Sequence, residues 1–100
     1  MKINICGIPH EVIYVNDEFN IDTHFGQIDY GKALIKISKD ISAEQQDEAV
    51  CHEVLHGILV HIGKGDLSQD EEFVQCLSNA IYQSFDPRIE EEEDEIHNRD

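Results

Sequence analysis

Hydrophobic and polar residues alternate in short runs through the first forty residues of the chain, a spacing that is typical of β-strands. We expect four strands, within residues 2–6, 11–15, 25–30 and 33–37. The second run is expected to pair with the first, after a turn at Gly7-Ile8-Pro9. Gly31 predicts a hairpin between the third and fourth runs, because glycine tolerates a positive φ. The fourth run does not alternate cleanly, so which of its residues are buried stays open.

From about residue 42 onward, hydrophobic residues recur at helical spacings instead. Ser42 is expected to cap a first helix, with Gln45 completing a capping box, and this helix should end near Gly63. Ser68 and Glu71 predict a second capping box, at the start of a helix that Asp86-Pro87 ends. The hydrophobic stripe of the second helix is expected to comprise Phe73, Val74, Leu77, Ala80, Ile81, Ser84 and Phe85.

These patterns predict an α+β fold in one domain. A small N-terminal antiparallel β-sheet would pack on the first helix, and the second helix would return antiparallel to the first. The chain has 100 residues, of which 40% are hydrophobic, so we place a single globular domain at residues 1–87. Residues 88–100 include an acidic block at 90–95, and we expect them to form a disordered tail.

Charge and apolar content restrict the partners of the protein. The net charge of −15 argues against a nucleic-acid partner. No apolar run reaches the ~18 residues of a membrane span, and the N-terminus lacks the apolar core and cleavage site of a signal peptide. We therefore expect a cytoplasmic protein with no membrane partner. In a reducing compartment Cys6, Cys51 and Cys76 would be free thiols, and we expect them to be small buried side chains.

The expected first helix carries the sequence His52-Glu53-Val54-Leu55-His56. Histidines four residues apart lie on one face of a helix, so both rings can reach a single Zn²⁺. The metal would lower the pKa of a water molecule, and Glu53 would take its proton as the water attacks a carbonyl group. On a helix this pattern is the signature of zincin metallopeptidases, so it predicts a zinc-dependent hydrolase acting on a protein or peptide substrate. The alternative is a polar helix face whose histidines are satisfied by neighbouring groups.

A catalytic zinc site needs a third protein ligand. Metzincins carry a histidine six residues after the second one of the motif, but here that position is Ile62. An antiparallel second helix would draw level with His56 at residues 71–75, so Glu71 and Glu72 are both candidates. We prefer Glu71, which lies beside the expected buried stripe, although it could instead serve only in the capping box with Ser68.

Residues 52–59 together with residues 71–78 resemble the ImmA/IrrE-like metallopeptidases, the minimal gluzincins of phages and prophages. Residues 25–30 and 35–37 resemble the strand pair that precedes the active helix in that family, and the resemblance extends over residues 1–86. It implies a zinc site of His52, His56 and a glutamate on the next helix, with Glu53 as general base. Larger relatives cut repressors during the induction of mobile elements, so a repressor is a candidate substrate by analogy.

The chain departs from the gluzincin pattern at one position. An acidic residue often follows the ligand glutamate at i+4, and here that position is Gln75, which can still hydrogen-bond a ligand. His61 could line a cleft, but we prefer a partly buried histidine with satisfied nitrogens. Tyr30 or Tyr82 could donate a hydrogen bond to an oxyanion, and the sequence does not choose between them.

Two other functions compete with the peptidase. A zincin fold could act without catalysis, as a module that binds and sequesters a partner protein. Alternatively, the acidic chain could be a decoy that occupies a basic protein. The intact Glu53 favours the peptidase, because a structural zinc ion needs no base at that place.

Overall fold

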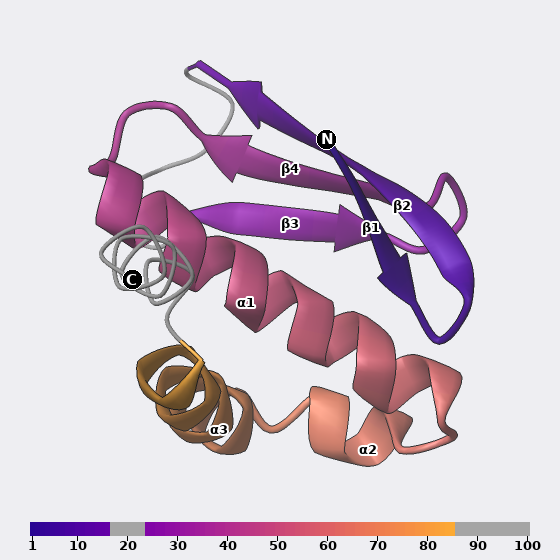
Figure 1. The fold of residues 1–100 in the computed structure, drawn as a ribbon. Coiled ribbons are helices and arrows are strands. Elements are labelled where there is room, and N and C mark those ends of the chain that lie inside the picture. Colours follow the sequence, from indigo (N-terminus) through magenta and orange to yellow (C-terminus); the bar gives the residue numbers. More distant parts are fainter. Residues whose placement is uncertain (17–23, 86–100) are drawn as a thin grey trace, which may run out of the picture.

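The structure is a computed structural model that describes residues 1–16 and 24–85. Its elements are, in chain order, β1 (Lys2–Ile5), β2 (Ile8–Val15), β3 (Gly26–Asp29), β4 (Leu34–Ser38), α1 (Ala43–His61), α2 (Gly65–Ser68) and α3 (Glu71–Ser84). The α+β class is confirmed: the sheet lies along one side of α1, and α3 lies on the other (Figure 1). The expected acidic tail and the helix stop at Asp86-Pro87 lie outside the described residues.

The four strands form one mixed sheet in the order β1-β2-β4-β3, so the expectation of a purely antiparallel sheet is wrong. Both β1–β2 and β3–β4 pair antiparallel, but β2 and β4 run parallel, with Val12 opposite Ile35. The reason is that β4 lies between β2 and β3. The β1–β2 and β3–β4 hairpins therefore meet through their second strands, β2 and β4, which run in the same direction. Residue alternation sets the face of each side chain but carries no information on strand direction.

The turn between β1 and β2 lies at Cys6-Gly7, slightly before the predicted position. These two residues have φ values of 52° and 84°, and Ile5 and Ile8 pair on either side of them. Pro9 therefore lies within β2, where its missing N–H is tolerated because the pairing of β2 with β4 begins only at Glu11. The second hairpin does contain Gly31, but the positive φ there belongs to Ala33.

The first hydrophobic cluster lies between the sheet and α1. Its buried members are Ile5, Val12, Ile35, Ile37 and Ala49. Ile35 and Ile37 therefore lie on the face of β4 that points toward α1. Helix and sheet approach closely at Gly57, where an added Cβ would lie 2.9 Å from the Cδ1 atom of Ile5.

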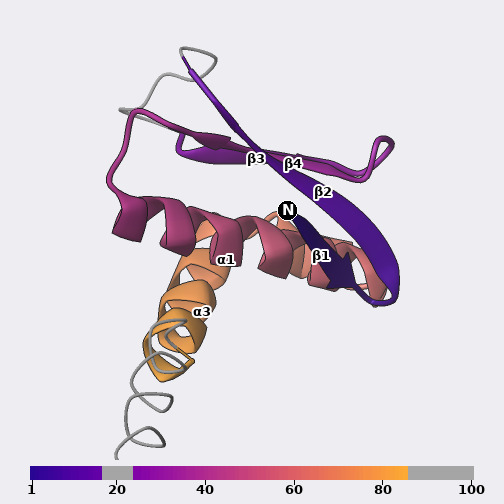
Figure 2. The same cartoon turned by 45° about the horizontal axis from the view of Figure 1, so that its top comes forward.

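A second cluster of Leu55, Leu59 and Val74 joins α1 to α3. Helix α1 is therefore packed on two sides, which explains why its hydrophobic residues are spread around the helix. Helix α3 leaves α1 at a steep angle and does not run back along it, so the expected antiparallel return is wrong (Figure 2). Its buried residues are Val74, Ser78 and Tyr82, whereas Phe73 and Phe85 of the predicted stripe are exposed.

The two predicted capping boxes have different outcomes. Ser42 and Gln45 form the box at the start of α1, as predicted. The box of Ser68 and Glu71 is wrong, because Ser68 is the last residue of α2 and the N-cap of α3 is Asp70. The Asp70 carboxylate accepts a hydrogen bond from the backbone N–H of Phe73 at 3.1 Å. The side chains of Ser68 and Glu71 are therefore available for other contacts.

The three cysteines are free thiols. The prediction that they are buried is wrong for Cys6 and Cys76 and correct only in part for Cys51. Cys6 and Cys76 are exposed. Cys51 is half-buried, its Sγ lies 3.5 Å from the carbonyl oxygen of Ser78, and burial raises the pKa of its thiol. Among the described residues, no helix combines the length and apolar character needed to cross a membrane.

Candidate metal centre

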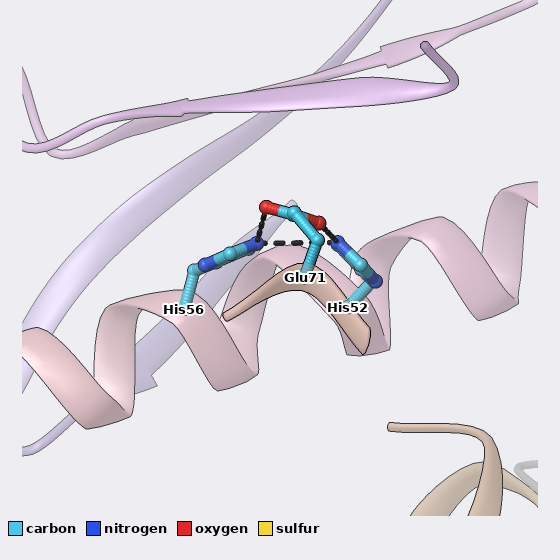
Figure 3. Close-up of side chains that lie close together, drawn as sticks. All are labelled: His52, His56 and Glu71. Carbon is cyan, nitrogen blue, oxygen red and sulfur yellow. Dashed lines mark hydrogen bonds and ion pairs between the residues drawn. The ribbon is translucent and has the colours of Figure 1, made fainter. Parts of the chain in front are cut away.

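His52 and His56 lie on successive turns of α1, with their Nε2 atoms 3.2 Å apart (Figure 3). Their side chains are only 18% and 11% exposed. The rings meet edge to face, with centroids 4.8 Å apart. The helical spacing therefore places the two nitrogen atoms together, as the sequence pattern requires.

Glu71 supplies the third group of this cluster. It is the first residue of α3, and its carboxylate bridges the Nε2 atoms of the two histidines (Figure 3). One carboxylate oxygen is 3.2 Å from Nε2 of His52, and the other is 3.1 Å from Nε2 of His56. Among the described residues these three side chains form the one group that could hold a metal ion, and Glu72 does not belong to it.

Further hydrogen bonds orient the two histidines. Nδ1 of His56 lies 2.9 Å from Oγ of Ser68, and both groups are buried. Gln75 lies close enough to His52 to raise the pKa of its ring, and the Gln75 amide nitrogen donates to Asn79 at 2.9 Å. Partners of this kind fix the orientation of a ligand histidine and the nitrogen that carries its proton. The sequence suggested the contact of Gln75, but it missed that of Ser68, whose spacing to Glu71 was interpreted as a cap.

Burial and the neighbouring His56 favour the neutral form of the His52 ring. Burial is the largest cause that lowers the pKa of His52, and the neighbouring His56 lowers it further. Glu71 and the hydrogen bond of Gln75 act in the opposite direction. A neutral ring has a lone pair to offer, which is the state that a metal ligand needs.

Glu53 lies on the sheet-facing side of α1 and is only 8% exposed. Burial and the negative charge of Glu71 raise its pKa to about 7. The backbone of Gly26 on β3 approaches it closely, because a Cβ at that position would lie 3.4 Å from Cγ of Glu53. A carboxyl group with a pKa near neutrality is suited to accept and release a proton at neutral pH.

A cleft of about 1000 Å³ opens beside these residues, between α1 and β3. His52, Glu53, His56 and Glu71 all line it, as do residues 24–28 of the edge-strand region, Tyr30 and Ser68. His61 is not among the lining residues: it is exposed, and its ring lies edge-on to that of His10 at 5.8 Å. The expectation that His61 is partly buried is therefore wrong.

The donor set suits a catalytic metal ion. Two imidazole nitrogens and one carboxylate oxygen form the His₂Glu set that catalytic zinc sites use. The donor atoms all lie within 4.8 Å of one another, so they converge on a common point. Other divalent transition metals also bind nitrogen and oxygen donors, so the three groups lie close enough to hold a metal ion but are not specific to zinc.

Comparisons of the chain with protein-family models, with curated proteins and with solved structures find no match. The chemical interpretation of the site therefore depends on its residues and their arrangement.

Proposed function

We propose that this protein is a zinc-dependent peptidase that uses His52, His56 and Glu71 as zinc ligands and Glu53 as general base. The observation that carries the proposal is the convergence of these three ligand groups beside a buried glutamate at the wall of an open cleft. A structural zinc site would be closed by a fourth protein ligand and would not need the base.

A zinc ion held by this set would supply Lewis-acid chemistry, acidifying water and polarising a peptide carbonyl group. Glu53 takes the proton of the attacking water and passes it to the leaving amine. The buried position of Glu53 suits both steps, because burial raises the pKa of the carboxyl group toward neutrality and helps it to hold the proton between them. Ser68 holds the His56 ring in place while the charge in the site changes.

The edge of the sheet supports an extended peptide as the substrate. Strand β3 is the last in the strand order and pairs only with β4 among the described strands. Its residues Gly26, Gln27 and Ile28 line the cleft beside the histidines. An extended segment can add to such an edge through main-chain hydrogen bonds, which would lay its backbone along the site.

The resemblance to the ImmA/IrrE-like metallopeptidases supports the same function. By analogy with the larger members of that group, a repressor or another regulatory protein of a mobile element is a candidate substrate. We place the activity in the cytoplasm, where three free cysteines would remain reduced.

The test separates metal binding from catalysis with two variants. Glu53→Gln should keep stoichiometric zinc but lower cleavage on the order of 10²–10⁴-fold, because the amide cannot take the proton. His56→Ala should lose zinc and cleavage together. Asp47→Asn is the matched control: it exchanges an exposed carboxylate for an amide on the same helix, outside the cleft.

Cleavage is measured on a degenerate peptide mixture, with the products identified by mass spectrometry and zinc quantified in the same samples. If Glu53→Gln cleaves as well as the wild type does, the peptidase proposal fails. A protein that binds zinc but shows no cleavage with or without Glu53 would instead be a binding module.

A further inference from the structure

Ser68 connects the metal centre to Tyr30. Its Oγ atom lies 2.9 Å from Nδ1 of His56, and its hydroxyl is close enough to Tyr30 to lower the pKa of that phenol. Ser68 is buried, whereas Tyr30 is 42% exposed, and both residues line the cleft. The three residues come from α1, from the end of α2 and from the turn after β3, so these contacts join three parts of the fold.

The direction of these hydrogen bonds follows from the role of His56. A histidine that offers the lone pair of Nε2 to a metal ion carries its proton on Nδ1. This proton is donated to Oγ of Ser68, so the single hydroxyl proton of Ser68 is available for Tyr30. The Tyr30 oxygen then accepts from Ser68 and keeps its own proton for a different acceptor.

Tyr30 lines the cleft, so its hydroxyl can donate that proton to a group bound there. Burial, together with the negative charges of Glu53 and Glu71, raises the pKa of its hydroxyl and outweighs the opposing effect of the Ser68 hydrogen bond. The hydroxyl is therefore protonated at neutral pH and able to donate. Tyr82, the other tyrosine considered for this role, is buried on α3 and does not line the cleft.

We propose that Tyr30 donates a hydrogen bond to the substrate carbonyl oxygen as negative charge develops on it, and that Ser68 is the positioning residue that orients this donor. The inference rests on the proposed peptidase function, but it concerns a residue outside the zincin motif. A donor aimed at the place where charge develops stabilises the transition state more than the substrate.

Binding of acetohydroxamate to the cobalt-loaded protein tests the donor without a known substrate. This probe presents a carbonyl oxygen and a charged oxygen to the metal, and its binding is followed by the visible absorption of cobalt. Tyr30→Phe should weaken probe binding about tenfold or more, because one hydrogen bond to a charged group is lost. The affinity for cobalt itself should change less than about twofold, since the phenol is not a ligand.

Tyr14→Phe is the matched control. It removes the hydroxyl of a half-buried tyrosine on β2 that does not line the cleft, and it should leave probe binding unchanged. Ser68→Ala provides the second arm: it should weaken cobalt binding about 10–100-fold, because His56 loses its partner. Ser68→Thr, which keeps the hydroxyl, should recover most of that loss.

The outcomes separate this inference from the proposed function. Cobalt-loaded Tyr30→Phe that binds the probe as tightly as the wild type overturns the donor role and leaves the metal centre standing. A wild-type protein that binds no cobalt overturns the metal centre and the donor role together.

Discussion

The two segments that form the candidate metal centre differ in how firmly the fold holds them. Helix α1 carries both histidines and Glu53, and it packs on the sheet with one side and on α3 with another. Glu71, by contrast, is the first residue of α3, and its side chain is 68% exposed. Its position depends on the short helix α2, on the Asp70 cap and on the α1–α3 cluster.

The difference indicates that the histidine half of the centre is preorganised, while the glutamate half is adjustable. The two histidines are fixed by helical spacing within a packed helix. Glu71 is exposed and lies in the first turn of α3, where fewer packed neighbours hold it. Stability and metal affinity should therefore respond differently to changes in the two halves.

Substitutions in the two hydrophobic clusters should give the largest effects. Ile35→Ala and Leu59→Ala each remove a buried side chain, and each should lower the free energy of unfolding by about 2–5 kcal/mol. Only Leu59→Ala loosens the α1–α3 contact that positions Glu71. In a zinc titration at a temperature where both variants are folded, Leu59→Ala should bind zinc more weakly than Ile35→Ala does. Equal zinc affinities would show that α3 packing does not position Glu71.

The buried carboxyl group of Glu53 should make the metal-free protein less stable at high pH. Its folded-state pKa of about 7 lies above the 4.5 of an ordinary glutamate, so the folded state holds the proton more tightly. The contribution of Glu53 to the free energy of unfolding is fully present below pH 4.5 and is lost as the pH rises through 7. Glu53→Gln should therefore stabilise the chelator-treated protein at pH 8, by up to about 3 kcal/mol, and leave it almost unchanged at pH 4.

Urea unfolding at the two pH values measures this effect. Glu72→Gln is the control, since Glu72 is exposed and its loss should alter stability similarly at both pH values. A Glu53→Gln variant that gains no stability between pH 4 and pH 8, relative to the wild type, would contradict the buried position of Glu53.

The close approach of β3 and β4 at Gly26 should give a smaller effect. A Cβ on Gly26 would lie 2.9 Å from Cδ1 of Ile37 and 3.1 Å from the backbone oxygen of Lys36, which cannot move aside easily. Gly26→Ala should therefore lower the free energy of unfolding by about 1–3 kcal/mol. At Gly31 the nearest atom would be 3.5 Å away, so Gly31→Ala should stay within about 0.5 kcal/mol of the wild type. Thermal unfolding of the two variants compares them directly, and equal melting temperatures would rule out the close approach at Gly26.

The same contrast explains how much of the structure the sequence could predict. The start of α1, its end and its motif follow from local signals: the Ser42 cap, the spacing of His52 and His56, and the glycine that follows the helix. Such signals depend only on neighbouring residues, so one sequence is enough to find them.

Features that depend on distant contacts were not predictable in this way. The parallel pairing of β2 with β4 depends on how two hairpins meet, which residue alternation does not encode. Ser68 and Glu71 have capping-box spacing, yet tertiary contacts with His56 and His52 occupy these side chains. The exposed Cys6 and Cys76 likewise follow from their places in a turn and on the outer side of α3, which composition does not reveal.

The affinity for zinc of Glu71→Gln, set beside that of Glu72→Gln, tests the central claim most directly. The two residues are adjacent, both exposed and equally charged, but only Glu71 contacts the histidines. In competition with a chromophoric chelator, Glu72→Gln should bind one zinc ion per chain as tightly as the wild type. Glu71→Gln should bind at least about 10–100-fold more weakly, since a ligand contributes no less than the groups that orient it. Equal zinc affinities for both variants and the wild type would contradict a centre formed by His52, His56 and Glu71.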